Sequence, residues 1–204
     1  MTSKHRIAAI VLTFFVSLCA QADDTTNWYI GGALGSASTK ADNSTFSQSE
    51  STGMLSAYVG YEVTEFFGIE AAAINTGDVA DDRSGLEDAS FFALTLTPKF
   101  NFPVSNEVSL YAKAGISLLS YYEKYNAPIV GVRNDEIFWI DIVPTAGIGA
   151  QYDISEMLAI RLSYDYISGD LNDYDDKNDS GGSNTVQNIN AELSIFTLGL
   201  QYKF

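Results

Sequence analysis

Thiols and imidazoles are nearly absent from this sequence. Its 204 residues include one cysteine, Cys19, and one histidine, His5, both close to the N-terminus. A single cysteine forms no intrachain disulfide, so a disulfide-stapled secreted domain is excluded. Nucleophilic catalysis needs a base beside the nucleophile, and that base is usually imidazole. We therefore expect no enzyme, because paired carboxylates are the only acid–base chemistry that remains.

Basic residues are also scarce. Eleven Lys and Arg stand against 26 Asp and Glu, which gives a formal net charge of −15 at pH 7. Proteins that bind nucleic acid neutralise its phosphates with Lys and Arg. We therefore expect no nucleic-acid partner, and we interpret the acidic excess as a solvated surface.

Residues 1–22 have the layout of a cleavable export signal. Two basic residues come first, an apolar run follows over 7–18, and the segment ends in the small-residue sequence AQA. The run is too short to span a bilayer as an anchor. A lipoprotein site at Cys19 is disfavoured because Leu18 is bulky. Cleavage would leave a domain over 23–204 with 9 basic and 26 acidic residues, or −17, because the signal carries two of the eleven basic residues and no acidic ones.

Downstream of the signal, alternation between apolar and polar residues replaces long apolar runs. No stretch of about 18 apolar residues is present there, so no transmembrane helix is predicted. Period-2 alternation rich in Gly, Tyr, Phe, Val, Ile and Thr is typical of strands. We expect eight strands, at about 27–38, 53–63, 67–75, 89–102, 108–122, 136–152, 158–168 and 189–204.

The connections between these strands alternate in length. Three are short, at 63–66, 103–107 and 153–157, and four are longer and polar, at 39–52, 76–88, 123–135 and 169–188. Such a rhythm is typical of an antiparallel meander with tight turns at one end and loops at the other. The predicted fold is all-β, an eight-stranded antiparallel up-and-down transmembrane β-barrel with both termini at the short-turn end.

The two faces of the predicted strands differ in polarity. Over 158–166 one face carries Leu, Ile and Tyr, and the other carries Ala159, Arg161, Ser163 and Asp165. Apolar side chains outward and polar ones inward suit a barrel in lipid, whereas a soluble barrel has the reverse arrangement. We expect no cofactor, because the interior of so narrow a barrel is filled by its own side chains.

Aromatic residues gather near both ends of the predicted strands, as in the girdles of outer-membrane barrels. Those near the short turns are Trp28, Phe67, Phe100, Phe102, Tyr152, Tyr202 and Phe204, and those towards the loops are Tyr122, Phe138, Tyr164 and Tyr166. Two prolines, Pro98 and Pro144, fall inside predicted strands. We expect bulges or local widening there, because proline donates no hydrogen bond to the ladder.

Several segments, taken in order, resemble the transmembrane domain of the outer-membrane protein A family. NWYIGGALG (27–35) is similar to its first strand, FFGIEAA (66–72) to its third and FTLGLQYKF (196–204) to its last. LTPKFNFPVSNEVSLYAKAG (96–115) is similar to the fourth and fifth strands, and AGIGAQYDISEMLAIRLSYDY (146–166) to the sixth and seventh. The resemblance implies an outer-membrane protein of a Gram-negative bacterium. The family's periplasmic peptidoglycan-binding domain has no counterpart in this sequence, so cell-wall anchoring is not carried over.

The resemblance also implies partners. The terminal strand would carry the signal read by the barrel-assembly machinery, on Leu198, Leu200, Tyr202 and Phe204. Outer-membrane lipid and lipopolysaccharide would surround the barrel, which we expect to be a monomer.

Charged residues on the inward faces form a candidate site. We expect Glu70, Lys99, Lys113 and Arg161 to lie inside at similar depth. Buried charges persist when they are paired, so the first interpretation is a salt-bridged plug. The resemblance implies an alternative, in which re-pairing of this interior charge cluster opens a narrow pore.

The balance of charge in that cluster is uneven. The position that resembles a second carboxylate of the family is Gln151. One carboxylate would then face three cations, unless Asp165, higher in the lumen, supplies the missing charge.

The segment LNDYDDKNDSGGSN (171–184) lies in an acidic loop. Carboxylate oxygens there resemble the ligands of calcium sites, although Lys177 occupies a ligand position and the EF-hand pattern fails. We therefore expect a solvated loop rather than a metal site. The acidic residues of this weak candidate are Asp170, Asp173, Asp175, Asp176 and Asp179.

The expected function is a structural one in envelope integrity, with four surface-exposed loops. Two alternatives stay open: a narrow, low-conductance channel gated by the interior salt bridges, and a surface adhesin or immune-evasion protein. Fold does not fix function, and the loops carry the difference between these classes.

Overall fold

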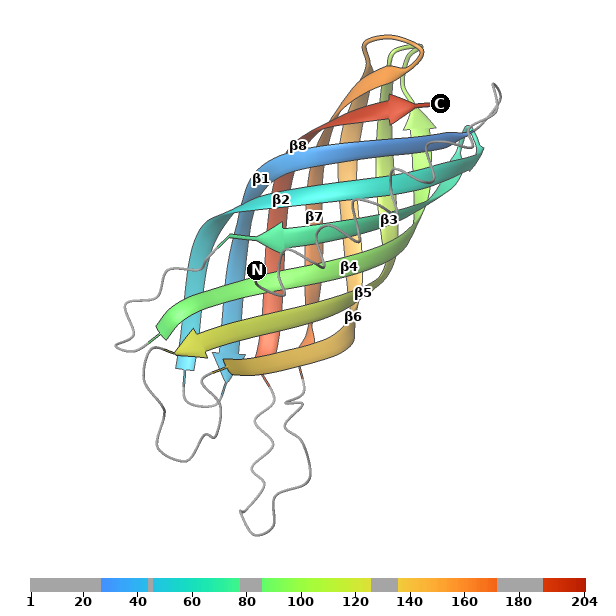
Figure 1. Cartoon of the computed structure of the whole chain (residues 1–204). Helices are drawn as coiled ribbons and strands as arrows, with labels where there is room; N and C mark the ends of the chain where they lie inside the picture. Colours follow the sequence, from blue (N-terminus) through green and yellow to red (C-terminus); the bar gives the residue numbers. More distant parts are fainter. Residues whose placement is uncertain (1–26, 44–45, 78–85, 126–135, 172–188) are drawn as a thin grey trace.

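The computed structural model describes residues 27–43, 46–77, 86–125, 136–171 and 189–204. Eight strands close into one antiparallel barrel in chain order, with β1 paired to β8 (Figure 1). The all-β up-and-down barrel is therefore confirmed. No helix in the described part of the chain is long and apolar enough to cross a membrane. The strands are β1 Trp28–Asn43, β2 Phe46–Thr64, β3 Phe67–Thr76, β4 Leu86–Pro103, β5 Val108–Tyr125, β6 Glu136–Asp153, β7 Leu158–Leu171 and β8 Ile189–Lys203.

The three short connections lie where they were predicted. They join β2 to β3, β4 to β5 and β6 to β7, and the C-terminus lies at the same end of the barrel (Figure 1). In two of the turns a serine hydroxyl accepts a hydrogen bond from the first residue of the next strand. Ser105 accepts from the Val108 amide and Ser155 from the Leu158 amide, each at 3.1 Å.

The prediction of a long first loop at 39–52 is wrong. The β1–β2 ladder continues in one register to the pair Asn43 and Phe46, so only residues 44–45 separate the strands. The sequence of this stretch is almost wholly polar, so alternation of polarity could not reveal the strands. Backbone pairing needs no apolar face once the register is set below it.

Seven of the strands are longer than lipid requires. They span 14–19 residues, whereas β3 has 10. Crossing a bilayer takes about 9–11 tilted residues. The wall of the barrel therefore continues several residues beyond the lipid on the side away from the short turns.

The expected bulges at the two prolines are absent. Among the described strands the register shifts only near Glu62 in β2 and near Leu86 in β4. Pro98 keeps its pairing with β3 while the pairing of 97–98 with β5 is interrupted. Pairing between β6 and β7 ends at Thr145, next to Pro144. Pairing is thus interrupted on one side of each proline, which donates no hydrogen bond to the ladder.

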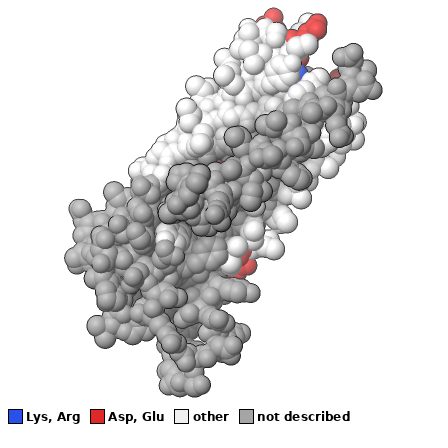
Figure 2. Space-filling view, viewed as in Figure 1, with Lys and Arg blue, Asp and Glu red and all other residues white. Residues whose placement is uncertain are grey.

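The outer surface of the lower barrel is apolar. Exposed residues on it include Leu55, Leu96, Leu110, Ile148 and Leu198, each between 50 and 62% exposed. On the face drawn in Figure 2, the described wall between the two ends is almost free of charged side chains. This belt is the surface that faces lipid.

Polarity reverses partway up several strands of the described barrel. In β8 the outward residues change from Leu198 and Phe196 to Ser194 and Glu192, while the inward ones change from Gln201 and Thr197 to Ile195 and Leu193. The same exchange occurs in β7 above Tyr166 and in β5 above Leu118. The prediction of a polar interior is therefore right for the lower half and wrong for the upper half. Beyond the lipid belt the wall is arranged as in a water-soluble barrel.

Candidate functional site

Glu70 is the centre of a charge network in the lower half of the lumen. It lies on the inward face of β3 and is 1% exposed. Its Oε1 lies 3.0 Å from Lys113 Nζ, and its Oε2 lies 2.7 Å from Arg161 Nη1. The Tyr29 hydroxyl donates a further hydrogen bond to Oε2 at 2.9 Å. One carboxylate on β3 therefore binds two cations and a phenol that come from three other strands.

Asp165 supplies a second buried carboxylate. Its Oδ1 lies 3.0 Å from Lys113 Nζ, so this ammonium group bridges Asp165 and Glu70. Gly147 leaves the space for this contact, because an added Cβ there would lie 2.2 Å from the Asp165 carboxylate. Glycine is the residue that allows such close approach.

Three tyrosines form an aromatic lining around the guanidinium group. Arg161 lies over the rings of Tyr58 and Tyr111, at 4.4 and 4.6 Å from their centroids. Each ring itself packs on a glycine of a neighbouring strand, Gly31 for Tyr58 and Gly149 for Tyr111. Cations over aromatic faces are stabilised by the ring quadrupole, which adds to the ion pairs.

Lys99 is the least satisfied member of the interior charge cluster. Its side chain is fully buried, and its Nζ has no hydrogen-bond acceptor among the described residues. The nearest acid is Glu62, with Oε1 at 3.7 Å, and the ring centroid of Tyr29 lies 4.4 Å away. This ammonium group is therefore stabilised by electrostatic attraction to the Glu62 carboxylate and to the face of the Tyr29 ring.

The six charged groups of the lower lumen balance. Glu62, Glu70 and Asp165 are set against Lys99, Lys113 and Arg161, and each of these groups lies within 4 Å of at least one group of opposite charge. Buried charges arranged in this way avoid the cost of an isolated ion.

Gln151 is the register partner of Arg161 across the β6–β7 pair, but its side-chain amide is bonded to an acid below the network. It is buried on β6 and donates a hydrogen bond through Nε2 to Asp153 Oδ1 at 2.8 Å. Asp153 also pairs with Lys203 Nζ at 2.9 Å. The partly exposed pair of Asp153 and Lys203 lies at the short-turn end, below the network. Another glutamine, Gln201, accepts a hydrogen bond from Arg161 Nη1 at 3.2 Å.

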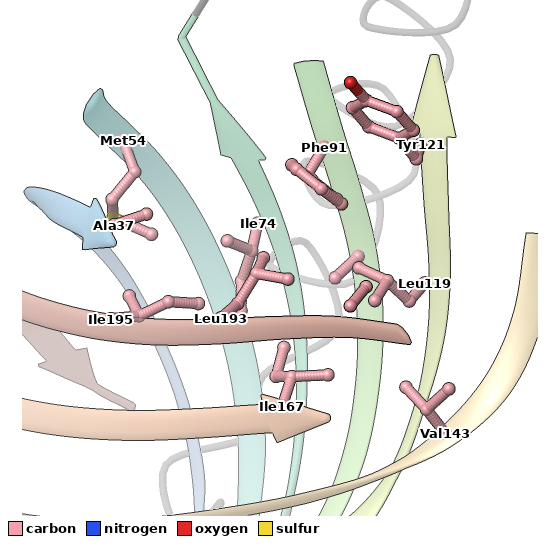
Figure 3. Close-up of a cluster of buried hydrophobic side chains, with 12 residues drawn as sticks. Ala37, Met54, Ile74, Phe91, Leu119, Tyr121, Val143, Ile167, Leu193 and Ile195 are labelled. Carbon is pink, nitrogen blue, oxygen red and sulfur yellow. The ribbon is translucent and has the colours of Figure 1, made fainter. Parts of the chain in front are cut away.

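An apolar section fills the lumen above the charges. Every strand contributes to it, and each member is at most 7% exposed (Figure 3). Leu119, Ile167, Leu193 and Ile195 are completely buried, so no water-filled passage touches them. Its members are Ala37, Met54, Ile74, Phe91, Ala93, Leu119, Tyr121, Val143, Ile167, Ala191, Leu193 and Ile195.

The residues proposed as an assembly signal lie on the outer wall. Leu198 and Leu200 face lipid, at 58 and 56% exposed, and the ring of Tyr202 meets that of Phe204 edge-on at 5.2 Å. The Phe204 amide donates a hydrogen bond to the Trp28 carbonyl at 3.0 Å, which ties the last residue to the first strand.

The acidic loop lies mostly outside the described residues. Asp173, Asp175, Asp176 and Asp179 fall within 172–188, outside the described residues, and the side chain of Phe138 in β6 is likewise not described. Asp170 is exposed on β7 and accepts a hydrogen bond from Asn190 at 3.0 Å. Within the described ranges no three His, Cys, Asp or Glu side chains come together as metal ligands.

Sequence reasoning missed two parts of this site. Neither Glu62 nor the three tyrosines were predicted as members of the interior charge cluster. Strand parity was sufficient to find them, because Tyr29, Tyr58 and Tyr111 share the inward face with the charges. The apolar section was predictable in the same way, because Leu119 and Leu193 alternate in step with the inward-facing residues of β5 and β8.

A family comparison agrees with this architecture. The model of the outer membrane protein beta-barrel domain matches residues 7–204. The chain belongs to that family. This outer-membrane β-barrel domain is 23% identical to outer membrane protein A of Shigella flexneri, covering 96% of this chain and 54% of that protein. It is 24% identical to outer membrane protein A of Klebsiella pneumoniae, covering 93% and 54%.

The barrel domain thus spans about half the length of these curated relatives. Among solved structures it is similar to neisserial surface protein A, with a TM-score of 0.62 at 17% identity over 88% of this chain and 98% of that one. OprG of Pseudomonas aeruginosa gives 0.54 at 16% identity, over 90% and 98%. The attachment invasion locus protein of Yersinia pestis gives 0.53 at 16%, over 86% and 98%. The protein is an outer-membrane β-barrel with the fold that these structures share.

Proposed function

We propose that this protein is a sealed, non-enzymatic barrel that contributes to the integrity of the outer membrane. The observation that carries the proposal is the apolar section of the lumen, whose side chains are almost wholly buried. Apolar spaces of this kind stay free of water, and ions do not cross an apolar constriction that is dewetted. The charge network below it then acts as a structural plug.

The geometry of the network supports the same function. Lys113 already contacts both carboxylates, Glu70 and Asp165, at 3.0 Å. A gate would need this cation to leave one partner for another and open a path. Moving it opens no path, because Leu119 and Ile195 fill the lumen on the other side.

The proposal extends to the surroundings of the barrel. We place it as a monomer in outer-membrane lipid and lipopolysaccharide, inserted by the barrel-assembly machinery through its terminal strand. The lipid-facing row of Leu198, Leu200 and Tyr202 supports this role for β8, because each side chain is exposed on the outer wall.

The test is envelope integrity in cells with and without the gene. Removal should increase sensitivity to detergent and to large antibiotics that an intact outer membrane excludes. Expression of the wild type should restore resistance, and so should Lys113→Ala at an equal amount of inserted protein, because the apolar section still seals the lumen. Unchanged sensitivity after removal would contradict the proposal, whereas rescue by the wild type alone would restore the gating interpretation.

A further inference from the structure

Three nitrogen donors inside the barrel have no hydrogen-bond acceptor among the described residues. They are Lys99 Nζ, Arg161 Nε and Gln201 Nε2, and the one further side-chain atom of this kind in the described part of the chain is the hydroxyl of Ser117. The three donor side chains are at most 3% exposed. A buried donor without an acceptor loses its bonds to water and gains nothing in return. The lower lumen therefore holds more donors than its own acceptors can serve.

Two of these donors belong to side chains that contact each other. Arg161 Nη1 donates to Glu70 Oε2 at 2.7 Å and to Gln201 Oε1 at 3.2 Å. Those bonds leave Nε of the guanidinium group and Nε2 of the amide without an acceptor. Both groups come from neighbouring strands, β7 and β8. A guanidinium nitrogen and an amide NH₂ donate only, so neither can satisfy the other.

The third donor, Lys99 Nζ, faces the same aromatic rings as Arg161. It lies 4.4 Å from the ring centroid of Tyr29 and 5.4 Å from that of Tyr111. Arg161 Cζ lies 5.9 Å and 4.6 Å from the same two centroids. The two cations therefore approach one region of the lumen from β4 and β7, with two aromatic rings common to both.

The most deeply buried charges carry a surplus of one positive charge. Three cationic side chains there are at most 10% exposed, but only two carboxylates, Glu70 and Asp165, are buried to a similar depth, at 2 and 11%. The remaining acid, Glu62, is 29% exposed, and its Oε1 is 3.7 Å from Lys99 Nζ, beyond hydrogen-bond distance. Water screens a partly exposed carboxylate, so Glu62 compensates the buried ammonium group only in part.

We propose that Lys99, Arg161 and Gln201 bind a small monovalent anion, chloride in a biological medium. One halide ion accepts hydrogen bonds from all three donors and neutralises the surplus charge, whereas a water oxygen has two lone pairs and no charge. The flexible stem of Lys99 lets its ammonium group turn from the Tyr29 ring towards the ion. The ion enters from the short-turn end, past the partly exposed Glu62. The site lies below the apolar section, so it does not depend on whether the lumen conducts.

The experiment compares the Tm of the refolded protein in two salts. The protein is placed in phosphatidylcholine vesicles with sodium chloride or with sodium gluconate, an anion too large for the lumen, each at about 0.15 M ionic strength. The wild type should melt about 2–4 °C higher in chloride, the shift expected for an ion at several times its Kd. Asp153→Asn is the matched control, because it removes a partly exposed ion pair outside the site and should keep the full shift.

Three variants change the site itself. Lys99→Met should lose most of the chloride shift, and so should Gln201→Glu, whose carboxylate takes the place of the anion beside Arg161. Glu62→Gln should enlarge the shift, because it removes the acid that competes for Lys99.

Two results would overturn the proposal. An equal shift in the wild type, Lys99→Met and Gln201→Glu would be a general salt effect, and no shift in the wild type would mean that water serves the donors. If Lys99→Met does not refold, Gln201→Glu still decides, because it adds a partner for a buried cation. Crystals soaked in bromide should show an anomalous peak beside Lys99, and a lumen without one would also contradict the site.

Discussion

Replacing Glu70 with Gln removes the charge that holds the lower lumen together. The side chain keeps its shape, but Arg161, 3% exposed, loses the carboxylate 2.7 Å away. Lys113 keeps Asp165 at 3.0 Å, so the guanidinium group bears most of the cost. Removing one partner of a buried ion pair costs about 3–5 kcal/mol. We expect the free energy of unfolding to fall by that amount.

The control is Asp153, a carboxylate that also pairs with a basic side chain but is more exposed to water. Asp153 lies 2.9 Å from Lys203, and both side chains are 25–30% exposed. Exposed pairs contribute roughly 0–1 kcal/mol, so Asp153→Asn should change the free energy of unfolding by less than that. The double variant Glu70→Leu with Arg161→Met should cost less than the sum of its single changes, because an apolar pair leaves no buried ion.

Reversible urea titration in lipid vesicles measures these differences. Tryptophan fluorescence is a suitable signal, since Trp28 is 41% exposed on the outer wall near the short turns. If Glu70→Gln and Asp153→Asn destabilise the barrel equally, within about 1 kcal/mol, Glu70 is not the centre of a buried network. The reasoning on the lower lumen would then fail.

Three further predictions follow from packing on the two sides of the wall. Leu119→Ala should cost about 2–5 kcal/mol in urea titrations, and more than Leu118→Ala, because lipid fills the space on the outer face. Gly147→Ala should cost about 1–3 kcal/mol, since its Cβ would meet a carboxylate at 2.2 Å, whereas Gly32→Ala has its nearest contact at 3.7 Å and should be tolerated. Phe204→Ala should slow insertion into the outer membrane of cells, measured by pulse-chase of heat-modifiable protein, and unchanged kinetics would count against the assembly signal.

The strand pattern was readable from sequence because lipid and lumen impose opposite demands on successive residues. In β5 and β7 the outward residues Leu110, Ile116 and Leu162 alternate with Lys113 and Arg161, so period-2 analysis found both strands and both faces. The interior charges were found for the same reason. Their partners across the lumen were not, because the pairing of Glu70 with Arg161 depends on strand stagger around the barrel.

The upper barrel was harder to predict because the alternation of apolar and polar residues reverses there. Apolar residues face outward below this level and inward above it. The phase change in β5 leaves Leu118 and Leu119 adjacent, and an adjacent pair reads as an irregularity in a strand with one apolar face. The first hairpin was missed for a different reason. The sequence at its end is almost wholly polar, so the register that continues from the membrane-spanning part specifies the pairing there.

Single-channel recording of the refolded protein in a planar bilayer tests the central claim, that the apolar section seals the lumen. The wild type and Lys113→Ala should show no discrete current steps, while a variant with Leu119→Ser, Leu193→Ser and Ile195→Ser should begin to conduct. Steps in the wild type that change with Lys113→Ala would contradict the account and make the charge network a gate.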